Sequence, residues 1–119
     1  MIEIVIAVFL SYLMGSIPTA FIAGKWLKGI DIREHGSGNM GATNVFRVLG
    51  KKPGIVVLVV DILKGVLGVV LVGQLFQFEE IFTFVALGIA SVCGHNWTVF
   101  LKFKGGKGIA TSLGVLVGL

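Results

Sequence analysis

Residues 54–76 read GIVVLVVDILKGVLGVVLVGQLF, and this stretch decides the class of fold. Apart from Asp61 and Lys64 it carries no formally charged side chain. An apolar run of this length matches the hydrocarbon core of a bilayer, which is about 30 Å thick. The stretch therefore predicts a membrane-spanning helix.

Two further apolar runs flank it at about the same length. Residues 4–24 and 81–101 each comprise 21 residues without Lys, Arg, Asp or Glu, and such a run extends about 31 Å as a helix. A fourth run begins at Ile109 and reaches Leu119, roughly half a crossing. We therefore predict an all-α, polytopic transmembrane helical bundle forming one integral membrane domain, residues 1–119, with spans at about 4–26, 54–76 and 81–101 and an incomplete span at 109–119.

Composition and charge support the membrane class. A mean hydropathy of +1.00 with 13% charged residues excludes an ordinary water-soluble domain. Nine of the ten Lys and Arg residues lie in the loops after the first and third spans, so the positive-inside rule places these loops in the cytoplasm. Membrane topology thus explains the basic charge, and no nucleic-acid partner is expected. The single Cys93 excludes a disulfide framework and a cysteine zinc site.

The second span carries two charges at membrane depth. Asp61 and Lys64 lie one helical turn apart on the same face, and ionisable residues at that depth cost several kcal/mol unless they are paired or hydrated. Two interpretations remain open. The residues form a pair that merely neutralises itself, or they line a polar cavity that opens toward the first loop.

The first loop contains GSGNMGATNVFR, residues 36–47. Glycines let backbone N–H groups converge, and an arginine supplies a planar fork for phosphate, so the composition favours an anion-binding site. The alternative is an ordinary polar loop between two spans. Residues 42–49 are expected to form two helical turns that end at Gly50 and Pro53.

The second loop reads KFKGGKGIAT, residues 102–111. Lys104 and Lys107 flank two glycines, and Gly108 precedes the predicted helix start, where backbone N–H groups can surround a phosphate. A nucleotide P-loop is excluded because Leu101 replaces its first glycine and Gly108 replaces its Ser or Thr. Two anion sites on one membrane face suggest phosphorylated substrates at a lipid interface.

Together these motifs resemble a known family. GSGNMGATNVFR, the DxxKG pattern from Asp61 to Gly65, and GHNWTVFLKFKGGKGIAT from Gly94 to Thr111 look like the bacterial acyl-phosphate:glycerol-3-phosphate acyltransferases. The resemblance implies a multi-pass enzyme of the bacterial inner membrane that makes lysophosphatidic acid for phospholipid biosynthesis. Members of this family have seven spans and a third motif with a His and an Asn. That motif is not found in these 119 residues, so the chain is expected to be the N-terminal part of a longer protein.

The resemblance implies transfer of an acyl group from acyl phosphate to the 1-hydroxyl of glycerol 3-phosphate. An acyl phosphate is already a mixed anhydride, so we expect no cofactor and no metal. We hypothesise that Arg47 and the Lys104–Gly108 loop hold phosphates, while Ser37 and Asn39 orient the reacting groups. The candidate residues are therefore Ser37, Asn39, Arg47 and His95 for catalysis; Gly38, Thr43, Asn44, Lys104, Gly105, Gly106, Lys107 and Gly108 for phosphate binding; and Asp61 and Lys64 for the cavity.

Several alternatives remain at this stage. The proton acceptor is the departing phosphate, His95, or a histidine of the missing motif. Ser37 as a covalent nucleophile paired with His95 is a second mechanism. A membrane transporter or channel for a phosphorylated solute would use similar glycine loops and broken helices, and a non-catalytic membrane subunit is a third possibility.

Overall fold

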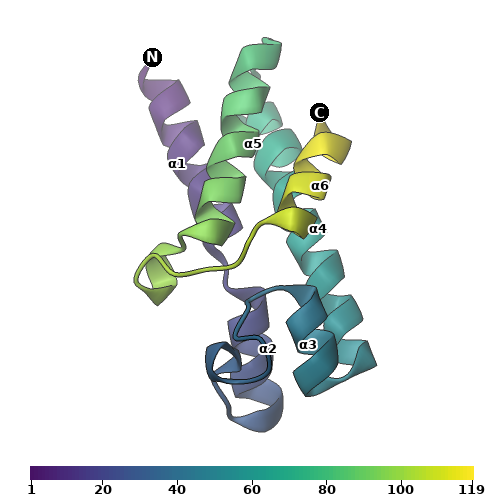
Figure 1. The fold of residues 1–119 in the computed structure, drawn as a ribbon. Coiled ribbons are helices and arrows are strands. Elements are labelled where there is room, and N and C mark those ends of the chain that lie inside the picture. Colours follow the sequence, from purple (N-terminus) through teal and green to yellow (C-terminus); the bar gives the residue numbers. More distant parts are fainter.

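The computed structural model describes residues 1–119, and every regular element in it is helical. Figure 1 shows a long bundle with a second, smaller layer packed at one end. The elements are α1 (Ile2–Ser16), α2 (Thr19–Lys28), the 3₁₀ turn η1 (Ile32–Glu34), α3 (Ala42–Leu49), α4 (Lys51–Leu75), α5 (Ile81–Asn96), the 3₁₀ turn η2 (Val99–Leu101) and α6 (Ile109–Gly118). The predicted all-α class is confirmed.

Three segments are long and apolar enough to cross a membrane. They are Ile2–Lys28, Lys51–Leu75 and Ile81–Leu101, whereas Ile109–Gly118 is a shorter apolar helix. Their positions correspond to the four apolar runs of the sequence. The chain is therefore a helical membrane bundle with three candidate spans.

The first of these segments is two helices. α1 ends at Ser16 and α2 begins at Thr19, with Pro18 between them. Proline has no N–H to donate and disfavours helical backbone at the residue before it. Ile17 accordingly has an extended ψ of 113°. The helix is thus completely broken at Pro18, and the break leaves backbone carbonyls without helical partners near the middle of the molecule.

The boundaries of the other elements follow from glycine and proline positions. The helix expected at residues 42–49 is confirmed as α3, and it ends at Gly50, whose φ of 106° favours glycine. α4 begins at Lys51, three residues before the predicted start, because Pro53 lies in its first turn, where no N–H is needed. α5 ends at Asn96, and the rest of the third span is an irregular turn.

Small residues bring the long helices together. α1 packs along α5 and α4 packs along α6. A methyl group at Gly15 would collide with the backbone of Ser91, and one at Gly114 would collide with the backbone of Ile62. Close backbone approach of this kind is typical of membrane helix packing, where apolar surface alone does not drive association.

The smaller layer contains α2, η1 and α3. It packs against α4 and η2 through a buried apolar cluster formed by Ala20, Ile32, Met40, Val45, Val57 and Leu101. The segment from α5 to α6 runs between this layer and the main bundle (Figure 1). Both glycine-rich loops therefore lie at the junction of the two parts.

Candidate functional site

A cavity of about 620 Å³ lies at this junction. One wall comes from the start of α3, the opposite wall comes from the start of α6, and side chains of α4 and α5 complete it. Its lining residues are Asn39, Gly41, Ala42, Thr43, Leu58, Asp61, His95, Lys107, Gly108, Ile109, Ala110, Ser112, Leu113 and Leu116.

Two helix N-termini face this cavity. The first helical hydrogen bonds run from Val45 N to Gly41 O in α3 and from Ser112 N to Gly108 O in α6. The backbone N–H groups ahead of these bonds have no partner within the helix. Neither N-terminus has a side-chain cap. Both helices therefore direct uncapped N–H groups and the positive ends of their dipoles toward the same space.

The first glycine loop is organised from within by Asn44. Its side chain is 1% exposed. Its Nδ2 donates to the carbonyls of Ile32, His35 and Asn39, and its Oδ1 accepts from Ser37 N at 3.0 Å. These contacts use the whole amide inside the loop, so they do not favour the phosphate contact expected of Asn44.

The second glycine loop is fixed to the end of α5. Gly105 N donates to Asn96 O at 2.9 Å, and Gly106 N donates to His95 O at 3.1 Å. A methyl group at Gly106 would lie 2.5 Å from His95 Nε2. These two glycines therefore allow the loop to lie directly against the imidazole, and their N–H groups serve the fold.

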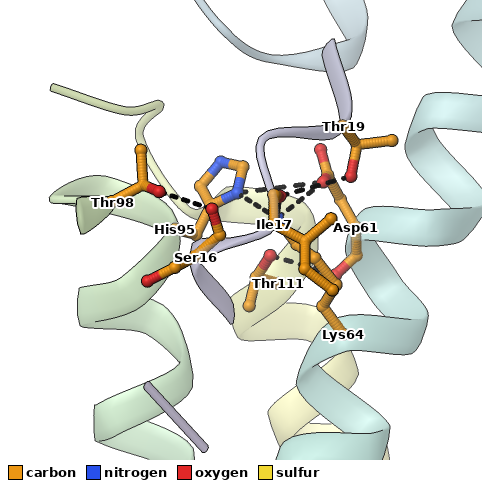
Figure 2. Close-up of polar contacts among 8 residues, drawn as sticks. All are labelled: Ser16, Ile17, Thr19, Asp61, Lys64, His95, Thr98 and Thr111. Carbon is orange, nitrogen blue, oxygen red and sulfur yellow. Dashed lines mark hydrogen bonds and ion pairs between the residues drawn. The ribbon is translucent and has the colours of Figure 1, made fainter. Parts of the chain in front are cut away.

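A buried charged cluster borders the cavity through Asp61 and His95, and Figure 2 shows its side chains. Lys64 Nζ lies 3.1 Å from Asp61 Oδ1 and 2.9 Å from His95 Nδ1. The side chains of Lys64 and Asp61 are 3% and 2% exposed. Asp61 Oδ1 accepts no directed hydrogen bond, so it depends on the ammonium for charge compensation. Only Asp61 and His95 of this cluster reach the cavity lining.

The helix break at Pro18 contributes to this cluster. Lys64 Nζ donates to the carbonyl of Ile17 at 2.9 Å, and the hydroxyl of Thr98 donates to the carbonyl of Ser16. Thr111 donates to the backbone carbonyl of Asp61 at 3.0 Å, which joins α6 to α4. The sequence gave no signal that Lys64 would donate to the carbonyl of Ile17 at this break.

The structure brings some of the candidate residues together and leaves others apart. Those in the cavity lining are Asn39, Thr43, Asp61, His95, Lys107 and Gly108. Those outside the lining are Ser37, Gly38, Asn44, Arg47, Lys64, Lys104, Gly105 and Gly106. The catalytic or binding role of each remains a prediction, and the lining residues have the more direct access to a ligand.

Sequence reasoning missed two features of the lining. Gly41, Ala42 and Ala110 contribute through their position at helix starts, for which their side chains give no signal. Leu58, Leu113 and Leu116 form an apolar side that continues along α4 and α6. The cavity is thus polar at the helix starts and apolar along the membrane-spanning helices.

A second ion pair lies at the surface of the smaller layer. The Arg33 guanidinium donates to both carboxylate oxygens of Asp31, with Nη2 2.8 Å from Oδ2. These hydrogen bonds hold the pKa of Asp31 below its usual value and raise the pKa of Arg33. The pair is partly exposed and does not line the cavity.

Comparison with known proteins gives a consistent result. Residues 5–119 match the family model described as glycerol-3-phosphate acyltransferase. The glycerol-3-phosphate acyltransferase of Pelodictyon phaeoclathratiforme is 50% identical over all of this chain and 54% of its own length. That of Exiguobacterium sibiricum is 52% identical over 98% of this chain and 55% of its own. The chain spans about half the length of the curated relatives it matches.

Two solved structures share the fold. The glycerol 3-phosphate form of PlsY (YgiH), an integral membrane glycerol 3-phosphate acyltransferase, superposes with a TM-score of 0.87 at 45% identity. The lysophosphatidic acid form of PlsY superposes with a TM-score of 0.83 at 44% identity. Each comparison covers 97% of this chain and 56% of the solved one.

Proposed function

The chain belongs to the glycerol-3-phosphate acyltransferase family, and from this premise we propose that its cavity binds glycerol 3-phosphate for acylation. The observation that carries the proposal is the convergence of two uncapped helix N-termini on one cavity. Such N-termini favour anions through free N–H groups and the helix dipole. The solved relatives named for glycerol 3-phosphate and lysophosphatidic acid support the same ligand class.

In this proposal the phosphate of glycerol 3-phosphate lies at the start of α6. Lys107 lines the cavity there and adds a positive charge to the N–H groups that follow Gly108. The start of α3, with Thr43 and Asn39, faces the glycerol from the other side. Arg47 and Lys104 lie outside the lining and attract the anion over a longer distance.

The apolar side of the cavity suits a fatty acyl chain. Leu58, Leu113 and Leu116 extend from the polar end along the membrane-spanning part of the bundle. We propose that acyl phosphate enters with its tail on this side. The glycerol oxygen forms a bond to the acyl carbon, the bond from that carbon to the phosphate oxygen breaks, and the hydroxyl proton leaves with the released phosphate in the overall balance.

The proposed location is the bacterial inner membrane, with both glycine loops on the cytoplasmic side. Nine of the ten basic residues lie in the loops on that side of the predicted topology, and basic loops are retained in the cytoplasm. Glycerol 3-phosphate would then approach from water and acyl phosphate from the membrane. Their meeting point is the junction where the cavity lies.

An assay of acyl transfer in lipid tests this function. The chain is reconstituted in vesicles and supplied with labelled glycerol 3-phosphate, with and without acyl phosphate. We expect lysophosphatidate only when acyl phosphate is present, and less of it from the Lys107→Ala variant than from Lys52→Ala. Lys52 is a matched control because it is an exposed lysine of α4 outside the cavity.

Other outcomes identify the competing functions. Uptake of labelled glycerol 3-phosphate into sealed vesicles without an acyl donor would indicate a transporter. The absence of both lysophosphatidate and uptake would indicate a non-catalytic subunit. An acyl adduct trapped on Ser37 would establish the covalent mechanism instead of direct transfer.

A further inference from the structure

The buried cluster restricts the protonation of its own histidine. Lys64 Nζ has three close polar neighbours, the carbonyl of Ile17 at 2.9 Å, His95 Nδ1 at 2.9 Å and, as an ion pair, Asp61 Oδ1 at 3.1 Å. An ammonium carries three N–H groups and no acceptor. Two of these N–H groups serve Ile17 and His95, and the positive charge of the ammonium compensates the carboxylate.

This arrangement leaves one role for His95 Nδ1. Because the ammonium can only donate, Nδ1 must accept, and a neutral imidazole then carries its proton on Nε2. Nε2 lies on the other edge of the ring, next to Gly106. His95 belongs to the cavity lining, whereas Lys64 does not. Lys64 therefore contacts the cavity lining indirectly, through its neighbours His95 and Asp61.

We propose that Lys64 is a positioning residue that sets the tautomer of His95, so that the imidazole of this cavity-lining residue carries its proton on Nε2 and can donate it in a hydrogen bond. Asp61 holds the ammonium in place, and the carbonyl freed by the break at Pro18 completes its coordination. A donor at this position suits an anionic oxygen, whereas the other tautomer would present a lone pair. The donation to a substrate oxygen rests on the function proposed above; the tautomer itself does not.

Nitrogen-15 NMR of the chain in lipid nanodiscs tests the tautomer without any ligand. The sequence contains only His35 and His95, and His35 lies in the first loop outside the cavity lining. A His35→Gln background therefore leaves one labelled ring. We expect Nδ1 to give the signal of an unprotonated nitrogen and Nε2 that of a protonated one. A protonated Nδ1 in this background would overturn the proposal.

The Lys64→Met variant tests the cause. Without the ammonium, Asp61 Oδ1 becomes the charged neighbour of Nδ1, at 3.8 Å, so we expect Nδ1 to become protonated. Lys64→Arg retains a cation with N–H donors and should restore the original signals. An unchanged tautomer in Lys64→Met would contradict the proposal, because the lysine would then not be the determinant.

A second variant covers the case in which Lys64→Met fails to fold. Asp61→Asn retains the size of the side chain and leaves Lys64 as the donor to Nδ1, so the Nε2–H signal should persist. Loss of the Nε2–H signal in Asp61→Asn would show that Asp61 determines the tautomer and would overturn the proposal.

Glycerol 3-phosphate is added in a last step, and we expect a chemical-shift change confined to Nε2. An intact tautomer with no shift would count against the proposed function and leave the tautomer assignment standing.

Discussion

The two polar regions of this molecule differ in how their hydrogen-bonding groups are used. In the buried cluster Lys64 makes two hydrogen bonds and one ion pair within 3.1 Å, and the two charged side chains are at most 3% exposed. At the cavity rim, by contrast, hydrogen-bonding groups lack such partners. The starts of α3 and α6 have no side-chain cap, and Lys107 is exposed.

This difference separates polar groups that support the fold from those that are free for a ligand. Asn44 and the N–H groups of Gly105 and Gly106 come from the glycine loops, yet they bond within the protein. The groups left without partners are the N–H groups at two helix starts. The hydrogen bonds that a polar motif makes within a membrane protein should therefore be identified before the motif is assigned a role in ligand binding.

The largest expected effect comes from removing one partner of the buried pair. Asp61→Leu leaves the Lys64 ammonium unpaired in a site that is 3% exposed. Breaking a buried pair in this way costs about 3–5 kcal/mol. The free energy of unfolding, measured by denaturation in mixed micelles, should fall by an amount in this range.

A double variant sharpens this test. Asp61→Leu with Lys64→Met removes both charges, and replacing a complete buried pair by apolar residues is often neutral. The double variant should therefore be more stable than Asp61→Leu alone. A double variant that is as unstable as the single one would show that the cluster stabilises the protein by something other than charge compensation.

A smaller effect is expected at the contact between the second loop and His95. The methyl group of Gly106→Ala would lie 2.5 Å from His95 Nε2, and overpacking of this kind costs about 1–3 kcal/mol. Because the imidazole must move, the affinity for glycerol 3-phosphate should fall by about tenfold. Calorimetric titration of the chain in nanodiscs measures this change.

Removing the imidazole ring of His95 tests whether the collision with it causes the loss of affinity. In Gly106→Ala with His95→Ala the collision no longer exists, so the two substitutions should not be additive. Strict additivity in the binding free energy would mean that the loop and the imidazole act independently, contrary to the geometry described here.

The smallest effect is expected at the surface pair of the smaller layer. Hydrogen bonds from Arg33 lower the pKa of Asp31, so their contribution to stability is present above the unfolded-state pKa and is lost as the pH falls through the folded-state pKa. Exposed pairs contribute less than about 1 kcal/mol. Asp31→Asn should therefore lower the thermal midpoint slightly at neutral pH and have no effect in acid. A loss of stability as large as that of Asp61→Leu would show that the surface pair and the buried pair do not differ in the way described.

Much of the fold was predictable from local patterns. The apolar runs predicted the three spans, and Gly50 predicted the end of α3. The hydropathy of the first span did not predict the complete break at Pro18, where the side chains of Lys64 and Thr98 donate to backbone carbonyls. Tertiary contacts of this kind leave no trace in the hydropathy of the first span.

The candidate site was predictable in part. Glycine loops and the Asp61 and Lys64 pair indicated the correct region, and six of the candidate residues line the cavity. The contact between Lys64 and His95 joins residues 31 positions apart, on two different helices. The sequence predicted N–H groups at the helix start after Gly108, but it did not reveal that the start of α3 faces the same cavity.

Titration of glycerol 3-phosphate into the chain in lipid nanodiscs tests the central claim most directly, with Lys107→Ala and Lys52→Ala measured alongside. One hydrogen bond to a charged group contributes about 1.5–3 kcal/mol, so we expect Lys107→Ala to weaken binding at least tenfold. Lys52→Ala removes the same charge outside the cavity lining and should leave the affinity nearly unchanged. Equal losses in both variants, or no loss in Lys107→Ala, would contradict a phosphate site at the start of α6.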